Sequence, residues 1–198
     1  MIIHISGPSG SGKTTLGNRL SKLPNTIVID TDDIDDPNSM KIIHKYSFET
    51  KKDEKLFDKE LEKLNKDQVN NILDKNKGKN IIFVGFFHAG MRNLEKKVDK
   101  GFSIKVDPNI LWRQYNLRTA TSIYKNFNEI KKLLESKMDE EKIHFIFSKK
   151  FGIRNGFECE GPNDMKEHLK RQKQRAINNG YFYNTSDKIF NEISKILS

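Results

Sequence analysis

The chain has 198 residues, of which 35% are hydrophobic and 32% charged, with a mean hydropathy of −0.73. This length favours one domain, and the composition excludes collagen-like, disulfide-scaffold and wholly disordered classes. A net charge of +9 attracts anions, nucleic acid among them. The cations are 29 Lys and only 7 Arg, and the chain is also rich in Asn and Ile, which indicates AT-rich coding bias. Because no basic stripe interleaved with aromatic residues accompanies the charge, this bias is favoured over a nucleic-acid-binding face.

No apolar run reaches the roughly 18 residues that a membrane span needs. The longest uncharged stretches are 1–12 and 80–91, and both contain Gly and His. The N-terminus has no basic region and no small-residue cleavage site, so secretion is not expected. We therefore expect a cytoplasmic protein in which the single Cys159 forms no intramolecular disulfide.

The N-terminal part of the chain alternates apolar strands with turns. Residues 1–6 are predicted to form a short buried strand, and 13–21 a helix that ends before Pro24. Residues 26–30 are β-branched and apolar, which predicts a second strand. This strand runs directly into an acidic segment at 30–36.

Further elements follow from the spacing of apolar residues and from Gly and Pro. Strands are expected at 80–87, 102–106 and 181–183, and helices at 50–75, 93–100, 108–134, 163–179 and the C-terminal residues. The residues expected to face inward are Ile123, Phe127, Ile130 and Leu134 in the long helix, and Ile189, Phe190, Ile193, Ile196 and Leu197 in the last one. Five strands alternating with helices predict an α/β fold, with a mainly parallel sheet covered on both faces.

One motif predicts chemistry. Its residues are Gly7, Pro8, Ser9, Gly10, Ser11, Gly12, Lys13, Thr14 and Thr15. The pattern of Gly, four residues, Gly, Lys and Thr lies between a predicted strand and a predicted helix, as phosphate binding requires. Glycines let the backbone aim its amides at phosphate oxygens, and the helix adds the positive end of its dipole. Lys13 would neutralise the β and γ phosphates of ATP, and Thr14 would offer its hydroxyl to Mg²⁺.

The acidic segment offers a second set of chemical groups. A carboxylate here could accept the proton of an attacking hydroxyl or hold a water bound to Mg²⁺. We expect Asp32 to be the base or to orient the hydroxyl, Asp33 to contact the substrate, and Asp30 to be an outer-shell metal ligand. The alternative is a solvated acidic loop that caps a helix, because five acids in seven residues cannot all be catalytic.

The loop at 7–15 resembles that of the P-loop kinases that phosphorylate small molecules, a group that includes shikimate, gluconate, nucleoside and nucleoside monophosphate kinases. This resemblance implies a three-layer α/β/α P-loop NTPase fold with a five-stranded parallel sheet of order 2-3-1-4-5. It also implies a lid, for which the aperiodic segment 135–161 is the candidate, within a single domain over residues 1–198. Asp30-Thr31-Asp32 is similar to the Asp-x-Asp of shikimate-type kinases, and Asp32-Asp33 resembles the paired acids of polynucleotide kinases.

The third predicted strand lacks the terminal acid of motor ATPases and GTPases, which assigns metal coordination to Thr14 and the segment 30–33. In similar kinases the loop after this strand faces the phosphoryl acceptor. The resemblance therefore implies that Phe86, Phe87 or His88 contacts a ring of the substrate and Arg92 an anionic group, with core packing as the alternative for the two Phe residues.

Two arginines follow the fourth predicted strand. Arg113 and Arg118 resemble the arginines near the lid of nucleoside monophosphate kinases, where guanidinium groups stabilise charge on the transferring phosphoryl. A solvated helix face is the alternative for both. The segment 184–187 is interpreted as a helix N-cap at Thr185 or Ser186 in preference to an adenine contact.

These observations predict an ATP- and Mg²⁺-dependent phosphotransferase that acts on a hydroxyl or phosphate of a small molecule, with nucleosides and nucleotides favoured. Two alternatives stay open. One is a kinase of polynucleotide 5′-hydroxyls, which the net charge and the basic run 170–175 suggest. The other is a nucleotide-binding regulatory protein without transfer activity. Neither zinc-ligand spacing nor a Ser-His-Asp arrangement can be read from the sequence.

Overall fold

A computed structural model of the chain describes residues 1–34, 51–85, 97–137, 143 and 162–198. The chain divides into two compact units, each described by itself below. The first comprises Met1–Lys105 and Lys173–Ser198, and the second Val106–Gln172. In these described ranges no helix has the length and apolar character to cross a membrane. The expected single domain over 1–198 stays a prediction.

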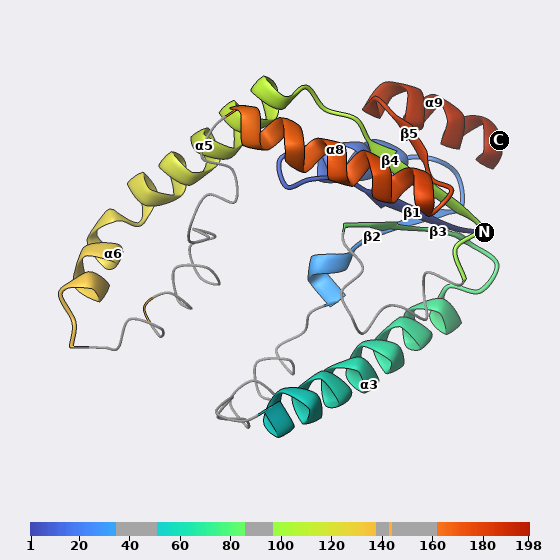
Figure 1. Cartoon of the computed structure of the whole chain (residues 1–198). Coiled ribbons are helices and arrows are strands. Elements are labelled where there is room, and N and C mark those ends of the chain that lie inside the picture. Colours follow the sequence, from blue (N-terminus) through green and yellow to red (C-terminus); the bar gives the residue numbers. More distant parts are fainter. Residues whose placement is uncertain (35–50, 86–96, 138–142, 144–161) are drawn as a thin grey trace. The chain divides into compact units, whose positions relative to one another are not determined.

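Five parallel strands form the sheet of the first unit (Figure 1). They are β1 Ile2–Ser6, β2 Thr26–Asp30, β3 Asn80–Val84, β4 Lys100–Ile104 and β5 Phe182–Asn184. Their order is β2-β3-β1-β4-β5, which confirms the expected order. Parallel pairing requires crossovers, and helices supply the described parts of them. All five strands therefore present their carboxyl ends at one edge of the sheet.

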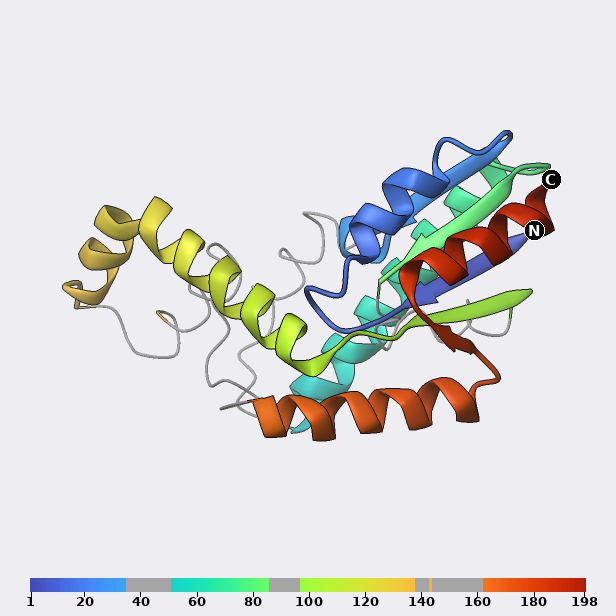
Figure 2. The same cartoon turned by 90° about the horizontal axis from the view of Figure 1, so that it is seen from above.

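Helices cover both faces of this sheet. They are α1 Lys13–Leu20, α3 Lys51–Lys75 and α9 Ser186–Leu197, with a 3₁₀ turn, η1, at Thr31–Ile34. Figures 1 and 2 place α1 and α9 together on one face and α3 on the other, which confirms the three-layer arrangement. In α9, Ile189 and Ile193 are fully buried as expected, whereas Phe190, Ile196 and Leu197 are half-buried.

Arg19 ties α1 to α9. Its Nη1 lies 2.7 Å from Asp187 Oδ1, and its guanidinium carbon lies 4.3 Å from the centroid of the Phe190 ring. The ion pair is exposed and contributes little by itself, but the stacked guanidinium also covers an apolar ring. These contacts fix the helix that follows the glycine-rich loop.

The second unit contains α5 Pro108–Lys125, α6 Phe127–Leu134 and the larger part of α8 Pro162–Asn178. Asp107 caps α5, since its Oδ1 accepts from the backbone N–H of Asn109 at 2.9 Å and of Ile110 at 3.2 Å. Pro108 follows at the first helical position, as expected. A small core joins α5 to α8, formed by Leu111, Met165 and Leu169 with Val106 and Trp112.

The expected long helix at 108–134 is wrong, because the chain forms two helices that break at Asn126. This residue has φ −112°, and its Nδ2 donates to the carbonyl of Ser122 at 2.8 Å. The break interrupts the helical row of apolar residues. Ile130 is buried as expected, but Ile123, Phe127 and Leu134 are 40%, 59% and 60% exposed.

The expected helix at 93–100 is also wrong over residues 97–100, and 93–96 lie outside the described residues. Asp99 pairs with the first strand instead: its N–H donates to Ile2 O at 2.8 Å and its Oδ2 accepts from Ile2 N–H at 2.7 Å. These bonds draw the segment into the sheet, so β4 begins at Lys100. The other bounds differ by one or two residues at most ends, and β3 ends at Val84.

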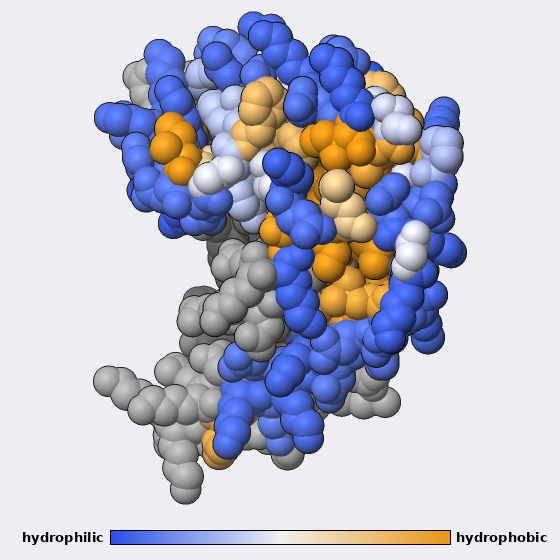
Figure 3. Space-filling model, turned by 90° about the vertical axis from the view of Figure 1, so that its right-hand side faces the viewer, coloured by the Kyte–Doolittle hydropathy of each residue, from blue (hydrophilic) through white to orange (hydrophobic). Residues whose placement is uncertain are grey.

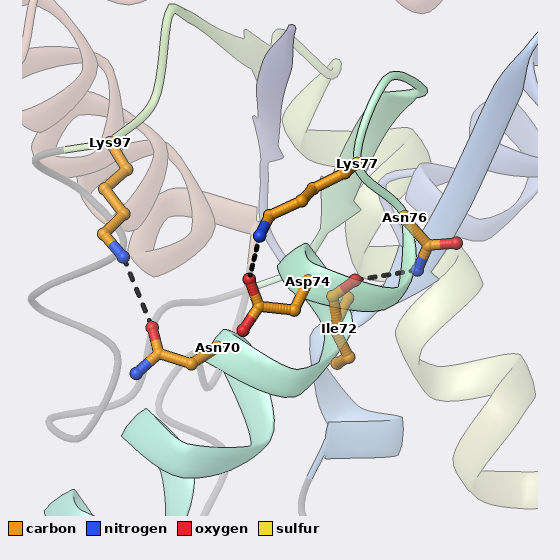
Figure 4. A network of polar contacts seen from close by, with 6 residues as sticks. All are labelled: Asn70, Ile72, Asp74, Asn76, Lys77 and Lys97. Atoms are coloured by element: carbon orange, nitrogen blue, oxygen red, sulfur yellow. Dashed lines mark hydrogen bonds and ion pairs between the residues drawn. The ribbon is translucent and has the colours of Figure 1, made fainter.

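Polar contacts close the C-terminal end of α3 (Figure 4). Asn76 Nδ2 donates to Ile72 O at 2.8 Å, Lys77 Nζ lies 3.1 Å from Asp74 Oδ1, and Lys97 Nζ donates to Asn70 Oδ1 at 3.3 Å. The last bond joins α3 to the segment before β4. On its inner face α3 contributes Val69 to a core cluster with Ile34, Ile81 and Phe83.

Figure 3 views the molecule from the right-hand side of Figure 1 and shows hydrophilic residues over most of the visible face, with a group of apolar residues between them. Met1 and Phe182 are among the described apolar residues that stay partly exposed, at 45% and 42%. Apolar residues make up a large share of the surface of ordinary globular proteins, so this group carries no function by itself.

His4 is a buried polar residue in the middle of β1. Its Nδ1 lies 2.7 Å from Tyr181 Oη and its Nε2 lies 3.1 Å from Gly85 O. Burial lowers the pKa of the imidazole from 6.5 to about 4. The ring is therefore neutral near pH 7, with Nε2–H donating to the Gly85 carbonyl and Nδ1 accepting from the Tyr181 hydroxyl.

This depressed pKa predicts a pH-dependent stability. The unfolded chain binds a proton at His4 below pH 6.5, whereas the folded chain binds it only near pH 4. The contribution of neutral His4 to the free energy of unfolding is therefore complete above pH 6.5 and is lost as the pH falls toward 4. Its upper size is about 3 kcal/mol, at 1.36 kcal/mol per pKa unit. Urea unfolding between pH 7.5 and 4.5 should show this slope, and His4→Gln should flatten it. His168→Gln, at a half-buried histidine in α8, should retain it. An unchanged slope in His4→Gln would contradict the assignment.

Candidate active site

The loop after β1 has the backbone geometry of an anion-binding turn. Gly10 and Gly12 have φ of 80° and 85°, a region that glycine tolerates and other residues avoid. Ser11 N–H donates to Pro8 O at 3.1 Å, and the first bond of α1 runs from Leu16 N–H to Gly12 O at 2.9 Å. The amides at the start of α1 precede that bond and are not used by the helical ladder. The turn therefore brings unused amides to the positive end of a helix dipole.

Lys13 lies over this loop. Its Nζ donates to the carbonyls of Gly7 at 2.8 Å and Pro8 at 2.9 Å, and its side chain is half-buried. Ser11 closes the loop from inside: its Oγ is buried and has no hydrogen-bond partner among the described residues. Ser9, Thr14 and Thr15 are exposed. The loop thus combines a fixed ammonium group with hydroxyl and amide donors.

The acidic segment forms a tight turn at the end of β2. Asp30 is the last residue of the strand, and its Oδ1 accepts from Asp32 N–H at 3.1 Å. Thr31 and Ile34 are buried, whereas Asp32 and Asp33 are exposed. One oxygen of Asp30 therefore caps the 3₁₀ turn, in agreement with the capping alternative for this residue. The two following carboxylates face outward from the turn.

The sheet order brings the loop and the acidic turn to the same edge. β3 lies between β1 and β2, with Val84 in register with Ile5 on one side and with Asp30 on the other. Two strand spacings of about 4.8 Å separate the ends of β1 and β2 by roughly 10 Å. This distance matches the scale of a triphosphate tail and a reacting group. The carboxyl edge of a parallel sheet is also where such folds bind ligands.

Gly85 explains why the acidic turn can approach the end of β3. Its φ is 138°, its N–H donates to Ile5 O at 3.0 Å, and Thr31 Oγ1 occupies the space that a Cβ at this position would need. The close approach at Gly85 was not predicted from the sequence. A glycine directly after the apolar run 80–84 was the available signal for a close approach.

Other predicted site residues belong to the second unit or lie outside the described residues. His88 and Arg92 lie outside the described residues. Arg113 and Arg118 are exposed on α5 in the second unit, and their role stays a prediction. The lid expected at 135–161 is described only at 135–137 and 143, so it also stays a prediction. Thr185 is the N-cap of α9, but its side chain makes no capping bond within the described part of the chain.

Comparison with known families identifies the chain. The sequence profile of a family described as an AAA domain matches residues 3–142. The chain belongs to this AAA domain family. The matched residues include β1 to β4, the loop and the acidic turn. Together with the strand order, this family match confirms the resemblance to P-loop small-molecule kinases. No curated protein sequence matches the chain.

Two solved structures are similar to this AAA domain protein. A shikimate kinase from Acinetobacter baumannii in complex with shikimate has a TM-score of 0.50 and 13% identity, and the alignment covers 99% of this chain and 92% of that one. A shikimate kinase from Bacteroides thetaiotaomicron has a TM-score of 0.48 and 15% identity, covering 100% and 98%. At 13% identity the likeness to the Acinetobacter baumannii structure is one of fold.

The close approach at Gly85 predicts the effect of a single methyl group. Gly85 and Gly78 both have positive φ, so Ala at either position costs on the order of 1–3 kcal/mol of backbone strain. Only Gly85→Ala forces a methyl group onto Thr31, since nothing lies within 4 Å of a Cβ at Gly78. We expect Gly85→Ala to lose a further 1–3 kcal/mol, roughly the cost of overpacking, in urea unfolding. Equal losses in the two variants would show that the acidic turn does not press on β3.

Proposed function

We propose that this AAA domain protein is an ATP- and Mg²⁺-dependent phosphotransferase that moves the γ-phosphoryl group to a hydroxyl or phosphate of a small molecule, with nucleosides and nucleotides as the favoured acceptors. One observation carries this proposal: the phosphate-binding loop and the acidic turn lie at the same edge of the sheet, with only β3 between them. That placement suits a nucleotide on one side and an acceptor on the other.

The residues of the loop fit a nucleoside triphosphate. The backbone amides at the start of α1 would bind phosphate oxygens, and Lys13 would exchange the carbonyls of Gly7 and Pro8 for the β and γ phosphates. The buried Ser11 Oγ supports a ligand at this loop, because a phosphate oxygen there would satisfy it. Residues 7–15 would thus hold the nucleotide.

The oxygen donors near the loop fit Mg²⁺, a hard cation that keeps several of its waters. Thr14 would bind the ion through its hydroxyl, and the second carboxylate oxygen of Asp30 would accept from a water on the ion. When bound, Mg²⁺ neutralises charge on the β and γ phosphates.

In the transfer step Asp32 would accept the proton of the attacking hydroxyl while a new oxygen–phosphorus bond forms and the bond between the γ-phosphorus and the bridging oxygen breaks, releasing ADP. Asp33, His88 and Arg92 would contact the acceptor. Arg113 and Arg118 would stabilise the charge that develops on the transferring group.

Loss of the loop cation should abolish activity. We expect Lys13→Ala to reduce phosphoryl transfer by at least about a hundredfold, because a fixed cation stabilises the transition-state charge. The control Lys22→Ala, at an exposed lysine just after α1, should leave transfer unchanged. The measurement is transfer from γ-labelled ATP with Mg²⁺ to a panel of nucleosides, nucleoside monophosphates, shikimate, gluconate and a 5′-hydroxyl oligonucleotide. Labelling of only the oligonucleotide would favour the polynucleotide kinase, and ATP binding without labelling of any acceptor would favour the regulatory protein.

The base assignment predicts a selective effect at the acidic turn. With the acceptor that the panel identifies, Asp32→Asn should lower kcat by about 10²–10⁴, the range for loss of a general base. Asp74→Asn, at an exposed aspartate that pairs with Lys77, should leave kcat unchanged. Full turnover by Asp32→Asn would refute the role of Asp32 as base, while the kinase proposal would stand.

A further inference from the structure

Asn65 is a buried amide in α3 that the site described above does not use. Its side chain is 1% exposed, and neither Oδ1 nor Nδ2 has a hydrogen-bond partner among the described residues. A carboxamide can accept through its oxygen and donate through both hydrogens of its nitrogen. Buried polar groups are almost always paired, and one left without partners destabilises the folded state. An amide with neither atom paired therefore points to a ligand that supplies the partners.

The direction of α3 places Asn65 toward the carboxyl edge of the sheet. The helix ends at Lys75 and the chain enters β3 at Asn80, so α3 runs antiparallel to the strands (Figure 1). Val69, one turn after Asn65 on the same helical face, packs in one cluster with Ile34 at the end of the acidic turn. Asn65 lies about 6 Å further along the helix axis, at 1.5 Å per residue, on the side of the strand carboxyl ends. The amide is thus next to the acidic turn, which the proposed mechanism assigns to the acceptor.

The chemistry of the amide limits what it can recognise. A carboxamide is neutral and presents a donor beside an acceptor in one plane, so it pairs best with a planar group that offers an acceptor beside a donor. The edge of a nucleobase has this pattern, and Asn and Gln bind adenine edges in the same way. A hydroxy acid would call for a cation to meet its carboxylate, which an amide does not provide.

We propose that Asn65 is a specificity-determining residue that binds the base of a nucleoside or nucleotide acceptor through paired hydrogen bonds. The inference rests on the proposed function, since it takes the acidic turn as the acceptor side of the site. The bonds form when the acceptor binds, and they leave the nucleotide loop at residues 7–15 unaffected.

The decisive variant is Asn65→Leu, which keeps the size of the side chain and removes the amide. If the amide has no partner in the folded chain, Asn65→Leu should keep or raise the urea unfolding midpoint. The control is Asn76→Leu, in the turn directly after the same helix, where Nδ2 donates to Ile72 O at 2.8 Å. This control should lower the midpoint, because it removes an existing bond. A midpoint of Asn65→Leu that falls as far as that of Asn76→Leu would overturn the proposal by showing a structural bond.

Binding gives the second readout. Calorimetric titration with adenosine, guanosine, cytidine, uridine and their deoxy forms should find a nucleoside that binds the wild-type chain and binds Asn65→Leu at least tenfold more weakly. Asn65→Asp keeps the shape but loses both N–H donors, so it should change the order of preference among the bases. Asn76→Leu should bind like the wild type. Equal affinities in Asn65→Leu and the wild type, or no nucleoside binding to either, would overturn the proposal.

A separate titration with ATP and Mg²⁺ distinguishes this outcome from failure of the proposed function. If ATP binds and an acceptor other than a nucleoside or nucleotide is phosphorylated, the kinase proposal holds and the role of Asn65 is wrong. If the chain does not bind ATP but the nucleoside affinity depends on Asn65, the base site is supported and the kinase proposal is wrong.

Discussion

The position of β3 between β1 and β2 is the constraint on which the candidate site depends. Each flanking strand ends in a turn that carries charge, one a phosphate-binding loop and the other an acidic 3₁₀ turn. β3 must therefore be followed by a residue whose side chain does not push these two turns apart. Gly85 meets this condition, since Thr31 fills the space of its missing Cβ.

The buried polar groups of the first unit divide into two kinds. His4 is satisfied on both nitrogens, and its neutral ring links β1 to the carbonyl of Gly85 and the hydroxyl of Tyr181. Ser11 Oγ, Thr31 Oγ1 and the amide of Asn65 are buried without hydrogen-bond partners among the described residues. These three lie in or next to the loop and the acidic turn, whereas Ser194 Oγ, near the C-terminal end of α9, is also buried without a partner there. Unpaired polar groups cost stability, and the three near the loop and the acidic turn are expected of a site prepared for a polar ligand.

The sequence was sufficient for those features that depend on local pattern. The apolar runs at 2–6, 26–30 and 80–84 predicted strands correctly, because parallel strands that are buried on both faces are continuous apolar segments. The loop at 7–14 is recognisable because each of its residue types has its own physical role. The strand order came from the family resemblance carried by that loop. The acidic turn was located, but only the structure assigns one Asp30 oxygen to a local cap.

Features that depend on distant partners were missed. Residues 97–100 have a helical composition, yet Asp99 pairs with Ile2, far away in sequence, and this pairing overrides the local preference. The break at Asn126 arises from an amide that can bond its own helix backbone, which composition alone does not decide. Asn65 lies one helical turn before Val69, on the same face of α3. From its residue type alone it resembles the solvated polar residues of this helix, and only its burial in the structure distinguishes it from them.

The divided role of Asp30 has a consequence for the chemistry of the acidic turn. Because its Oδ1 holds Asp32 N–H at 3.1 Å, the orientation of the proposed base depends on the residue proposed to hold the metal-bound water. Here both functions would fall on one turn of four residues, Thr31–Ile34, and the strand residue before it. Binding of Mg²⁺ would therefore stiffen the same turn that receives the acceptor, so the two ligands should bind with positive coupling.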